Sequence, residues 1–209
     1  MANPSYMPNV LFFIPDIGGF TRFVTETEIS HSQHTIRELL ELLVDSNEMG
    51  LQVAEFEGDA VLFVRTTPSS VEELLQQAQT MFGNFHAYLR EREKVRVCQC
   101  GACARMHQLT LKFIAHSGPA SIMDIKGHSK FIGKSVIVVH RLLKNSVPVP
   151  EYLLVTEELL DQLNRSSPLA ESFERGSHRY DELGEVPYRH HALTMHPDMP
   201  SQYSQRMET

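Results

Sequence analysis

The sequence predicts an α+β domain with a mostly antiparallel sheet and helices packed on it. The expected elements follow the order strand, helix, hairpin, helix, hairpin, helix, strand. Such local connections favour an antiparallel-dominated sheet, and the ferredoxin-like arrangement is the obvious candidate. The chain has 209 residues, of which 42% are hydrophobic and 22% charged, so it is long enough to bury a substantial core.

Two short-range patterns define the elements of the N-terminal half. Apolar residues recur from Ile36 to Leu43 at the spacing of one buried helix face. Ser70 followed by Glu73 is a capping box, which predicts the start of a helix. The expected elements are a buried strand over 10–17, one or two helices over 20–47, a hairpin over 51–65 that turns at Glu57-Gly58-Asp59, and a helix from 70 to about 92.

The C-terminal half is expected to contain a second hairpin over 109–127, turning near Ser117-Gly118-Pro119. The further expected elements are a helix opened by Gly133, a strand at YLLVT, a helix at EELLDQL and closing strands within YDELGEVPYRHHALT. We expect a single domain over 1–196, with a cysteine-rich insert over 95–108 that lacks strand or helix periodicity. The polar segment 197–209 is expected to be a flexible tail.

Composition excludes several classes of partner. The net charge of -7 argues against nucleic acid and acidic membrane surfaces, whose phosphates would repel the chain. No apolar stretch approaches the roughly 20 residues that span a bilayer. The first residues lack the basic start and apolar core of a secretory signal, so a cytoplasmic location is expected.

Two carboxylates lie at places where the chain reverses. Asp16 ends the first expected strand, and Asp59 lies at the tip of the first hairpin. If these elements are neighbours in the sheet, both carboxylates project at one edge, where they suit Mg²⁺. Gly18 and Gly19 would then let a phosphate approach the backbone. The alternative is that Asp16 is only a helix cap and Asp59 only a turn residue.

Five motifs resemble, in the same order, those of class III adenylate/guanylate cyclase catalytic domains. The motifs, spread over residues 9–194, are FFIPDIGGFTRF, EFEGDAVLFV, LKFIAHSGPA, GKSVIVVHRLL and YDELGEVPYR. The resemblance implies a ferredoxin-like cyclase-homology domain that acts in signalling. It also implies a purine nucleotide ligand, two Mg²⁺ or Mn²⁺ ions and a homodimer with shared sites.

The resemblance also assigns roles to individual residues. Asp16, Asp59 and the Ile17 carbonyl match the metal ligands, and Arg141 matches the arginine that stabilises the transition state. Arg189 falls where the family usually has a lysine that contacts the triphosphate. The positions that match the triphosphate-binding segment are Gly18, Gly19, Phe20 and Thr21. Glu55 and Lys130 match the purine-selecting pair; Glu55 is the guanylate cyclase type, whereas Lys130 fits neither usual pairing.

One departure bears on catalysis. Ile137 stands where the family has a catalytic asparagine that orients the ribose. The sequence therefore predicts a domain that binds metal and a purine nucleoside triphosphate, with cyclase activity weak or lost. The alternatives are an active adenylate or guanylate cyclase, and a non-enzymatic dimeric ligand-binding or interaction module on the same fold.

All three cysteines lie in the insert. Cys98, Cys100 and Cys103 are followed by His107, a set compatible with a structural Zn²⁺ site of the Cys₃His type. The spacing differs from paired C-x-x-C knuckles. Free cytosolic thiols and a Cys100–Cys103 redox pair are the alternatives.

Overall fold

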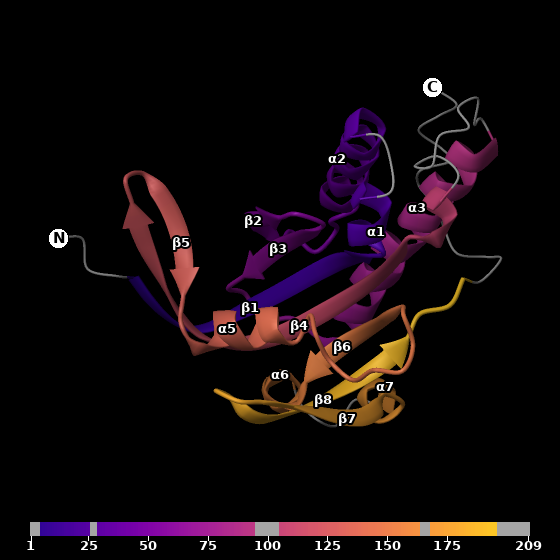
Figure 1. The fold of residues 1–209 in the computed structure, drawn as a ribbon. Helices are drawn as coiled ribbons and strands as arrows, with labels where there is room; N and C mark the ends of the chain where they lie inside the picture. The colour runs from indigo at the N-terminus through magenta and orange to yellow at the C-terminus, as the bar shows by residue number, and fades with distance from the viewer. Residues whose placement is uncertain (1–4, 26–28, 95–104, 164–167, 196–209) are drawn as a thin grey trace.

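The computed structural model describes residues 5–25, 29–94, 105–163 and 168–195 (Figure 1). Its centre is an eight-stranded sheet with the strand order β2-β3-β1-β4-β6-β8-β7, in which β5 pairs with β4 alone. All neighbouring strands are antiparallel except β4 and β6. The strands are β1 (Ser5–Gly18), β2 (Gln52–Glu57), β3 (Ala60–Arg65), β4 (Thr110–Ile125), β5 (His128–Ile132), β6 (Tyr152–Thr156), β7 (Glu174–Tyr180) and β8 (Gly184–Ala192).

Helices cover both faces of this sheet. One face packs against α1, α2, α3 and α6, and the other against α5. The helices are α1 (Phe20–Thr25), α2 (Ile29–Asp45), α3 (Val71–Lys94), α5 (Lys134–Arg141), α6 (Glu157–Gln162) and α7 (Pro168–Glu171), with a 3₁₀ turn, η1, at Met106–Gln108. The expected α+β class and mostly antiparallel sheet are confirmed, and the order β2-β3-β1-β4 is that of the ferredoxin-like core.

The capping box predicted before α3 is present. The Ser70 backbone N–H donates to the Glu73 carboxylate at 2.8 Å, and the Glu73 N–H donates to the Ser70 hydroxyl at 3.1 Å. Two backbone donors of the first turn are therefore satisfied, so the helix begins where the sequence predicts.

The hairpin predicted near Ser117-Gly118-Pro119 is wrong. β4 continues through these residues, and the chain turns instead at Lys126-Gly127, where both residues have positive φ. Pairing of β1 with β4 slips here, because Pro8 and Asn9 lie opposite Pro119 alone. A β-bulge accommodates two prolines that cannot donate ladder hydrogen bonds, so this Gly-Pro pair marks an irregular strand rather than a turn.

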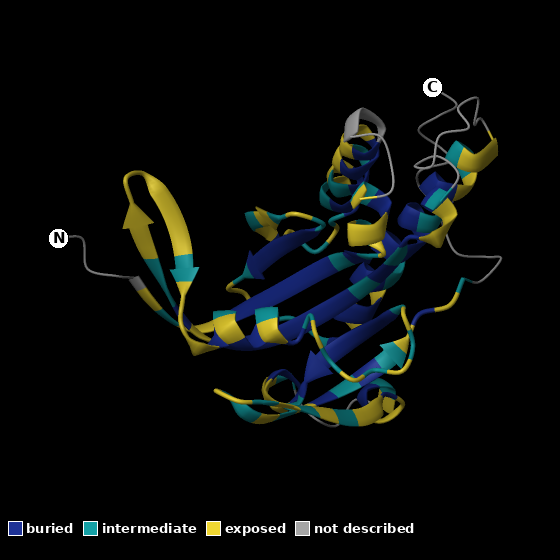
Figure 2. Ribbon diagram, in the orientation of Figure 1, coloured by how far each residue is buried: buried dark blue, intermediate teal, exposed yellow. Residues whose placement is uncertain are grey.

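The extra length of β4 builds an arm with β5 that extends from the body of the molecule (Figures 1 and 2). Most of β5 is exposed.

The last hairpin also differs in extent from its prediction, since β7 begins at Glu174, before the YDELG turn. The cysteines of the insert and the predicted tail lie outside the described residues. No helix in the described part of the chain has the length and apolar character needed to cross a membrane.

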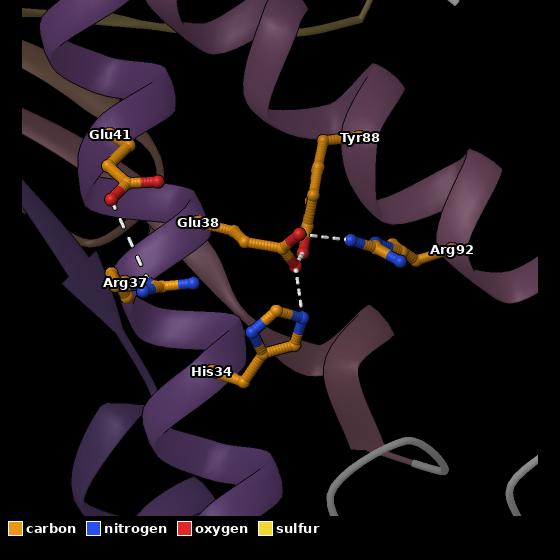
Figure 3. Close-up of polar contacts among 6 residues, drawn as sticks. All are labelled: His34, Arg37, Glu38, Glu41, Tyr88 and Arg92. Carbon is orange, nitrogen blue, oxygen red and sulfur yellow. Dashed lines mark hydrogen bonds and ion pairs between the residues drawn. The ribbon is translucent and has the colours of Figure 1, made fainter.

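A polar cluster joins α2 to α3. The Glu38 carboxylate accepts a hydrogen bond from the Tyr88 hydroxyl at 2.6 Å and pairs with Arg92, and His34 lies 3.4 Å away (Figure 3). Burial and the hydrogen bond to Glu38 raise the pKa of Tyr88, so its hydroxyl remains a donor. One carboxylate thus holds two side chains of the neighbouring helix.

We expect Glu38→Ala to lower the free energy of unfolding by about 1–3 kcal/mol, because a partly buried carboxylate shared by two donors is lost. Glu41→Ala is the matched control on the same helix. The Glu41–Arg37 pair spans 3.8 Å and both side chains are about two-thirds exposed, so its loss should cost less than about 1 kcal/mol. Denaturant unfolding measures both values. Equal losses in the two variants would contradict a special role for Glu38.

Candidate functional site at the Asp16–Asp59 edge

Asp16 lies on the sheet face that α5 covers. Side chains alternate along β1, and Phe12 and Ile14 on the same side belong to the core beneath α5. Asp16 pairs across the sheet with Ala60 of β3 and with Lys112 of β4. The register therefore places a carboxylate and an ammonium group side by side at the end of an otherwise apolar face.

Lys112 is a site residue that the sequence analysis missed. Its Nζ lies 3.0 Å from Asp16 Oδ2 and donates to the Leu143 carbonyl at 2.8 Å. The side chains are only 21% and 14% exposed, so the ion pair is largely shielded from water. The detectable signal was a single lysine within the apolar run LTLKFIAHSG. The register between β1 and β4, which places Lys112 opposite Asp16, could not be derived from the sequence.

Asp59 lies at the tip of the β2–β3 hairpin beside Asp16. Its backbone carbonyl accepts a hydrogen bond from the Ile17 N–H at 3.1 Å, which ties the hairpin tip to the end of β1. Burial raises the pKa of Asp59, and the negative charge of Asp16 raises it further. The predicted proximity of the two aspartates is therefore present, and their repulsion destabilises the ionised form of Asp59.

This donor set fits a divalent cation. Two hard carboxylate oxygens at one edge are what Mg²⁺ or Mn²⁺ takes from a protein when water and substrate phosphates complete the coordination. Within the described ranges, no group of three or more His, Cys, Asp or Glu side chains forms a denser metal site. Lys112 reduces the negative charge available at Asp16.

The two glycines after Asp16 have structural causes of their own. A Cβ on Gly18 would lie 2.2 Å from Thr110 Oγ1, and Gly19 adopts a φ of +83°. The Gly19 carbonyl accepts from the Phe23 N–H at 3.0 Å, which opens the short helix α1 with Phe20 and Thr21. Close packing at Gly18 and the left-handed turn at Gly19 therefore disfavour larger residues here even without a bound phosphate.

A cavity of about 720 Å³ opens on the same face of the sheet, between β2, β5, α5 and β7. Glu55 and Lys130, the pair assigned to purine selection, both line it, and they form an ion pair of 3.3 Å across it. Arg141 also lines the cavity and pairs with Glu182 at 3.2 Å. Ile137 contributes an apolar wall and is 52% exposed.

A second missed pair, Glu57 and His140, lies in the wall of this cavity. The His140 ring bonds Glu57 Oε1 through Nε2 at 2.5 Å and the Val136 carbonyl through Nδ1 at 2.6 Å. Both partners are acceptors, so the contacts favour the imidazolium, and the Glu57 bond is the main reason that the pKa of His140 is raised. Glu57 lies in the motif EFEGDAVLFV and His140 in GKSVIVVHRLL, at positions to which the resemblance assigns no role.

Arg189 does not join the other candidates in this chain. It pairs with Val155 of β6, whose side chain packs in the core beneath α2, α3 and α6. Its Nε donates to Glu157 at 2.8 Å and its Nη1 to the Ala170 carbonyl at 3.0 Å. Strand alternation therefore directs this guanidinium to the face opposite Asp16.

The zinc prediction stays untested. Cys98, Cys100 and Cys103 lie outside the described residues, and only His107 is described, as an exposed residue of the 3₁₀ turn before β4.

Solved structures that resemble this fold include catalytic domains of nucleotide cyclases. The adenylyl cyclase CyaB of P. aeruginosa is 14% identical, with a TM-score of 0.61 over 95% of this chain and 100% of its own. The catalytic core of a rhodopsin-guanylyl cyclase in complex with ATPalphaS is 17% identical, with a TM-score of 0.62 over 92% of this chain and 100% of its own. The protein therefore has the class III cyclase catalytic-domain fold.

The chain belongs to the family described as "Protein of unknown function (DUF2652)", whose model matches residues 36–152. An uncharacterized protein of Mycobacterium tuberculosis is 32% identical over 142 residues. That match spans 66% of this chain and 66% of the relative's length. The family match includes Asp59, Lys112 and Arg141, whereas Asp16 and Arg189 lie outside it.

The electrostatics of the aspartate pair predict opposite effects of two similar substitutions. Asp59→Asn should raise the free energy of unfolding near neutral pH, because the folded pKa of Asp59 lies above its unfolded value and ionisation therefore costs stability above that pKa. Asp16→Asn should lower it, because Lys112 loses its carboxylate in a largely buried setting. Denaturant unfolding in chelator-treated buffer separates the two. A loss of stability in Asp59→Asn would contradict the repulsion between the aspartates.

Proposed function

We propose that this domain binds a divalent metal ion and a purine nucleoside triphosphate on the α5 face, with cyclisation weak or lost. The observation that carries the proposal is the aspartate pair: Asp16 and Asp59 come from separate elements, converge at one edge and repel each other. A carboxylate whose pKa is raised by burial and by a second carboxylate is a candidate for a functional role. The cyclase fold of the chain makes a metal–nucleotide site the matching chemistry.

The cavity supports an anionic ligand that carries a ring. Its volume falls within the range of about 300–1,000 Å³ typical of small-molecule sites. The charged residues that line it are Lys130, Arg141 and Lys144, two carboxylates, Glu55 and Glu57, and His140, whose contacts favour the imidazolium. Apolar walls from Leu62, Phe131 and Ile137 suit a base or ribose, and the excess of cations suits phosphates.

In this proposal Asp16 and Asp59 hold the metal ion, whose charge offsets that of the triphosphate. Glu55 contacts the purine edge and Arg141 the phosphate chain. Both are engaged in ion pairs, with Lys130 and Glu182 respectively, which a ligand has to exchange for its own contacts. Arg189 contributes nothing to this cavity from the same chain, because its guanidinium is bound to Glu157 and Ala170 on the opposite face.

Ile137 is the reason for proposing weak or absent chemistry. Its side chain can neither donate nor accept a hydrogen bond, so it cannot orient the ribose hydroxyl for attack on the α-phosphate. Removal of one such positioned polar group typically costs about 10²–10³ in rate.

An active cyclase remains the second candidate, because the aspartates and Arg141 are retained. A homodimer, the assembly expected from the resemblance, belongs to the same proposal.

Thermal unfolding with Mn²⁺ and a panel of ATP, GTP and their non-hydrolysable analogues tests the proposal. A nucleotide at about 100 times its dissociation constant should stabilise the native state by roughly 2.7 kcal/mol. The stabilisation that the nucleotide adds should require the metal and should disappear in Asp59→Ala. Asp181→Ala is the matched control, since Asp181 is an exposed turn carboxylate of the β7–β8 hairpin. The absence of any nucleotide-dependent shift would contradict the proposal.

Substitution of Ile137 tests whether this residue limits the formation of cyclic nucleotide. Ile137→Asn should leave nucleotide binding intact and increase the formation of cyclic nucleotide, whereas Ile137→Val should not. The position is half exposed, so an asparagine is tolerated without burying an unpaired amide. Chromatographic detection of the cyclic product gives the readout. High activity in the unmodified protein would favour the active cyclase over the proposed degenerate one.

A further inference from the structure

A second, smaller cavity lies at the other end of β3 from Asp59. It has a volume of about 190 Å³ and is bounded by the start of β1, the loop between β3 and α3, and α6. Side-chain alternation along β3 places it on the sheet face opposite the Asp16 cavity, because Arg65 follows Val61 and Phe63 on that side. The polar residues that line it include Asn9, Arg65, Thr67, Ser69, Ser117 and Gln162.

Sheet register fixes the position of Arg65 in this cavity. Arg65 pairs with Leu11 of β1, and Leu11 pairs with Ser117 of β4, so the three residues form a row across three strands. The Arg65 Nε donates to the Thr67 hydroxyl at 2.5 Å. This contact holds the guanidinium against the loop that leads into α3.

Part of the hydrogen-bond capacity of this cavity is unused within the described part of the chain. Arg65 Nη1 and Ser69 Oγ are both buried, and neither has a hydrogen-bond partner among the described residues. Burial of a polar atom without a partner is costly, so proteins normally satisfy such groups. Two unsatisfied atoms that line one cavity therefore indicate a missing acceptor.

The charges around the cavity indicate that the missing hydrogen-bond acceptor is negatively charged. Arg65 is the one charged residue that lines it, and no carboxylate of the described residues lines the cavity or forms an ion pair with Arg65. An arginine without a carboxylate partner is unexpected in a chain in which acidic residues outnumber basic ones and the net charge is -7. The capping box already engages Glu73 with Ser70, so the site does not depend on the N-terminus of α3.

We propose that this cavity is a binding site for a small oxyanion, of the chemical class of inorganic phosphate or a phosphoryl group. A guanidinium with a hydroxyl beside it matches such an anion, because Arg presents donors in a planar fork and Ser69 adds another. The apolar floor from Leu11, Leu159 and Leu163 limits access of water and strengthens the electrostatic attraction. The site is separate from the proposed nucleotide cavity, and neither proposal depends on the other.

The test is a calorimetric titration of the full chain with inorganic phosphate, in metal-free buffer with chloride at constant ionic strength. Phosphate should bind the unmodified protein in preference to chloride. Arg65→Gln should weaken binding at least about tenfold, since a charge-assisted contact is lost. Ser69→Ala should weaken it to a smaller extent. Arg37→Gln is the matched control, because Arg37 is an exposed arginine on α2 whose carboxylate partner is Glu41.

Arg141→Gln distinguishes the two cavities, because the phosphate binding that depends on Arg65 should persist in this variant. Phosphate binding that is lost in Arg141→Gln but kept in Arg65→Gln would assign the anion to the larger cavity and overturn the proposal. No preference over chloride would also overturn it, because water alone would then satisfy Arg65 and Ser69. Circular dichroism verifies the fold of each variant. If Arg65→Gln fails to fold, Arg65→Lys takes its place, and it should retain measurable phosphate binding because it keeps the positive charge.

Discussion

The ion pair between Asp16 and Lys112 depends on the register of the central strand β1, and the rest of the site depends on the same register. Phe12, Phe13 and Ile14 are fully buried, so β1 packs against core on both faces. A slip of one residue would exchange the two faces and move Asp16 to the side of α2 and α3. Burial of β1 therefore fixes the place where the carboxylate emerges, and the Ile17–Asp59 backbone bond brings the second aspartate to it.

The same sheet supports two cavities of different chemistry. The larger one combines cations, carboxylates and apolar walls on the same face of the sheet as Asp16. The smaller one, at the opposite end of β3, presents the Arg65 guanidinium, which has no carboxylate partner among the described residues. Ile137 removes hydrogen-bonding capacity from the larger cavity, whereas Lys112 and the Glu57–His140 pair add polar contacts around it. The cyclase fold of this chain thus presents a charged cavity on the α5 face, with the apolar Ile137 in its wall.

Sequence patterns predicted most of the fold because the signals were local. The capping box at Ser70 and the hairpin at Glu57-Gly58-Asp59 depend on neighbouring residues alone. The turn predicted near Gly118 failed because a bulge at Pro8 and Asn9, opposite Pro119, allows the strand to continue. At the site, the proximity of Asp16 and Asp59 was predictable from the element order. The roles of Lys112 and Glu57 were not predictable, because cross-strand register and the docking of α5 determine their positions. Strand alternation, which directs Arg189 to the opposite face, also depends on the register of the sheet.

The measurement that tests the central claim most directly is Mn²⁺ binding followed by electron paramagnetic resonance, without nucleotide. The aspartate pair should bind the ion in the unmodified protein, and Asp59→Asn should abolish binding. Ile137→Asn should leave binding unchanged, since Ile137 supplies no metal ligand. If Mn²⁺ does not bind, or binds Asp59→Asn with equal affinity, the two carboxylates do not form a metal site.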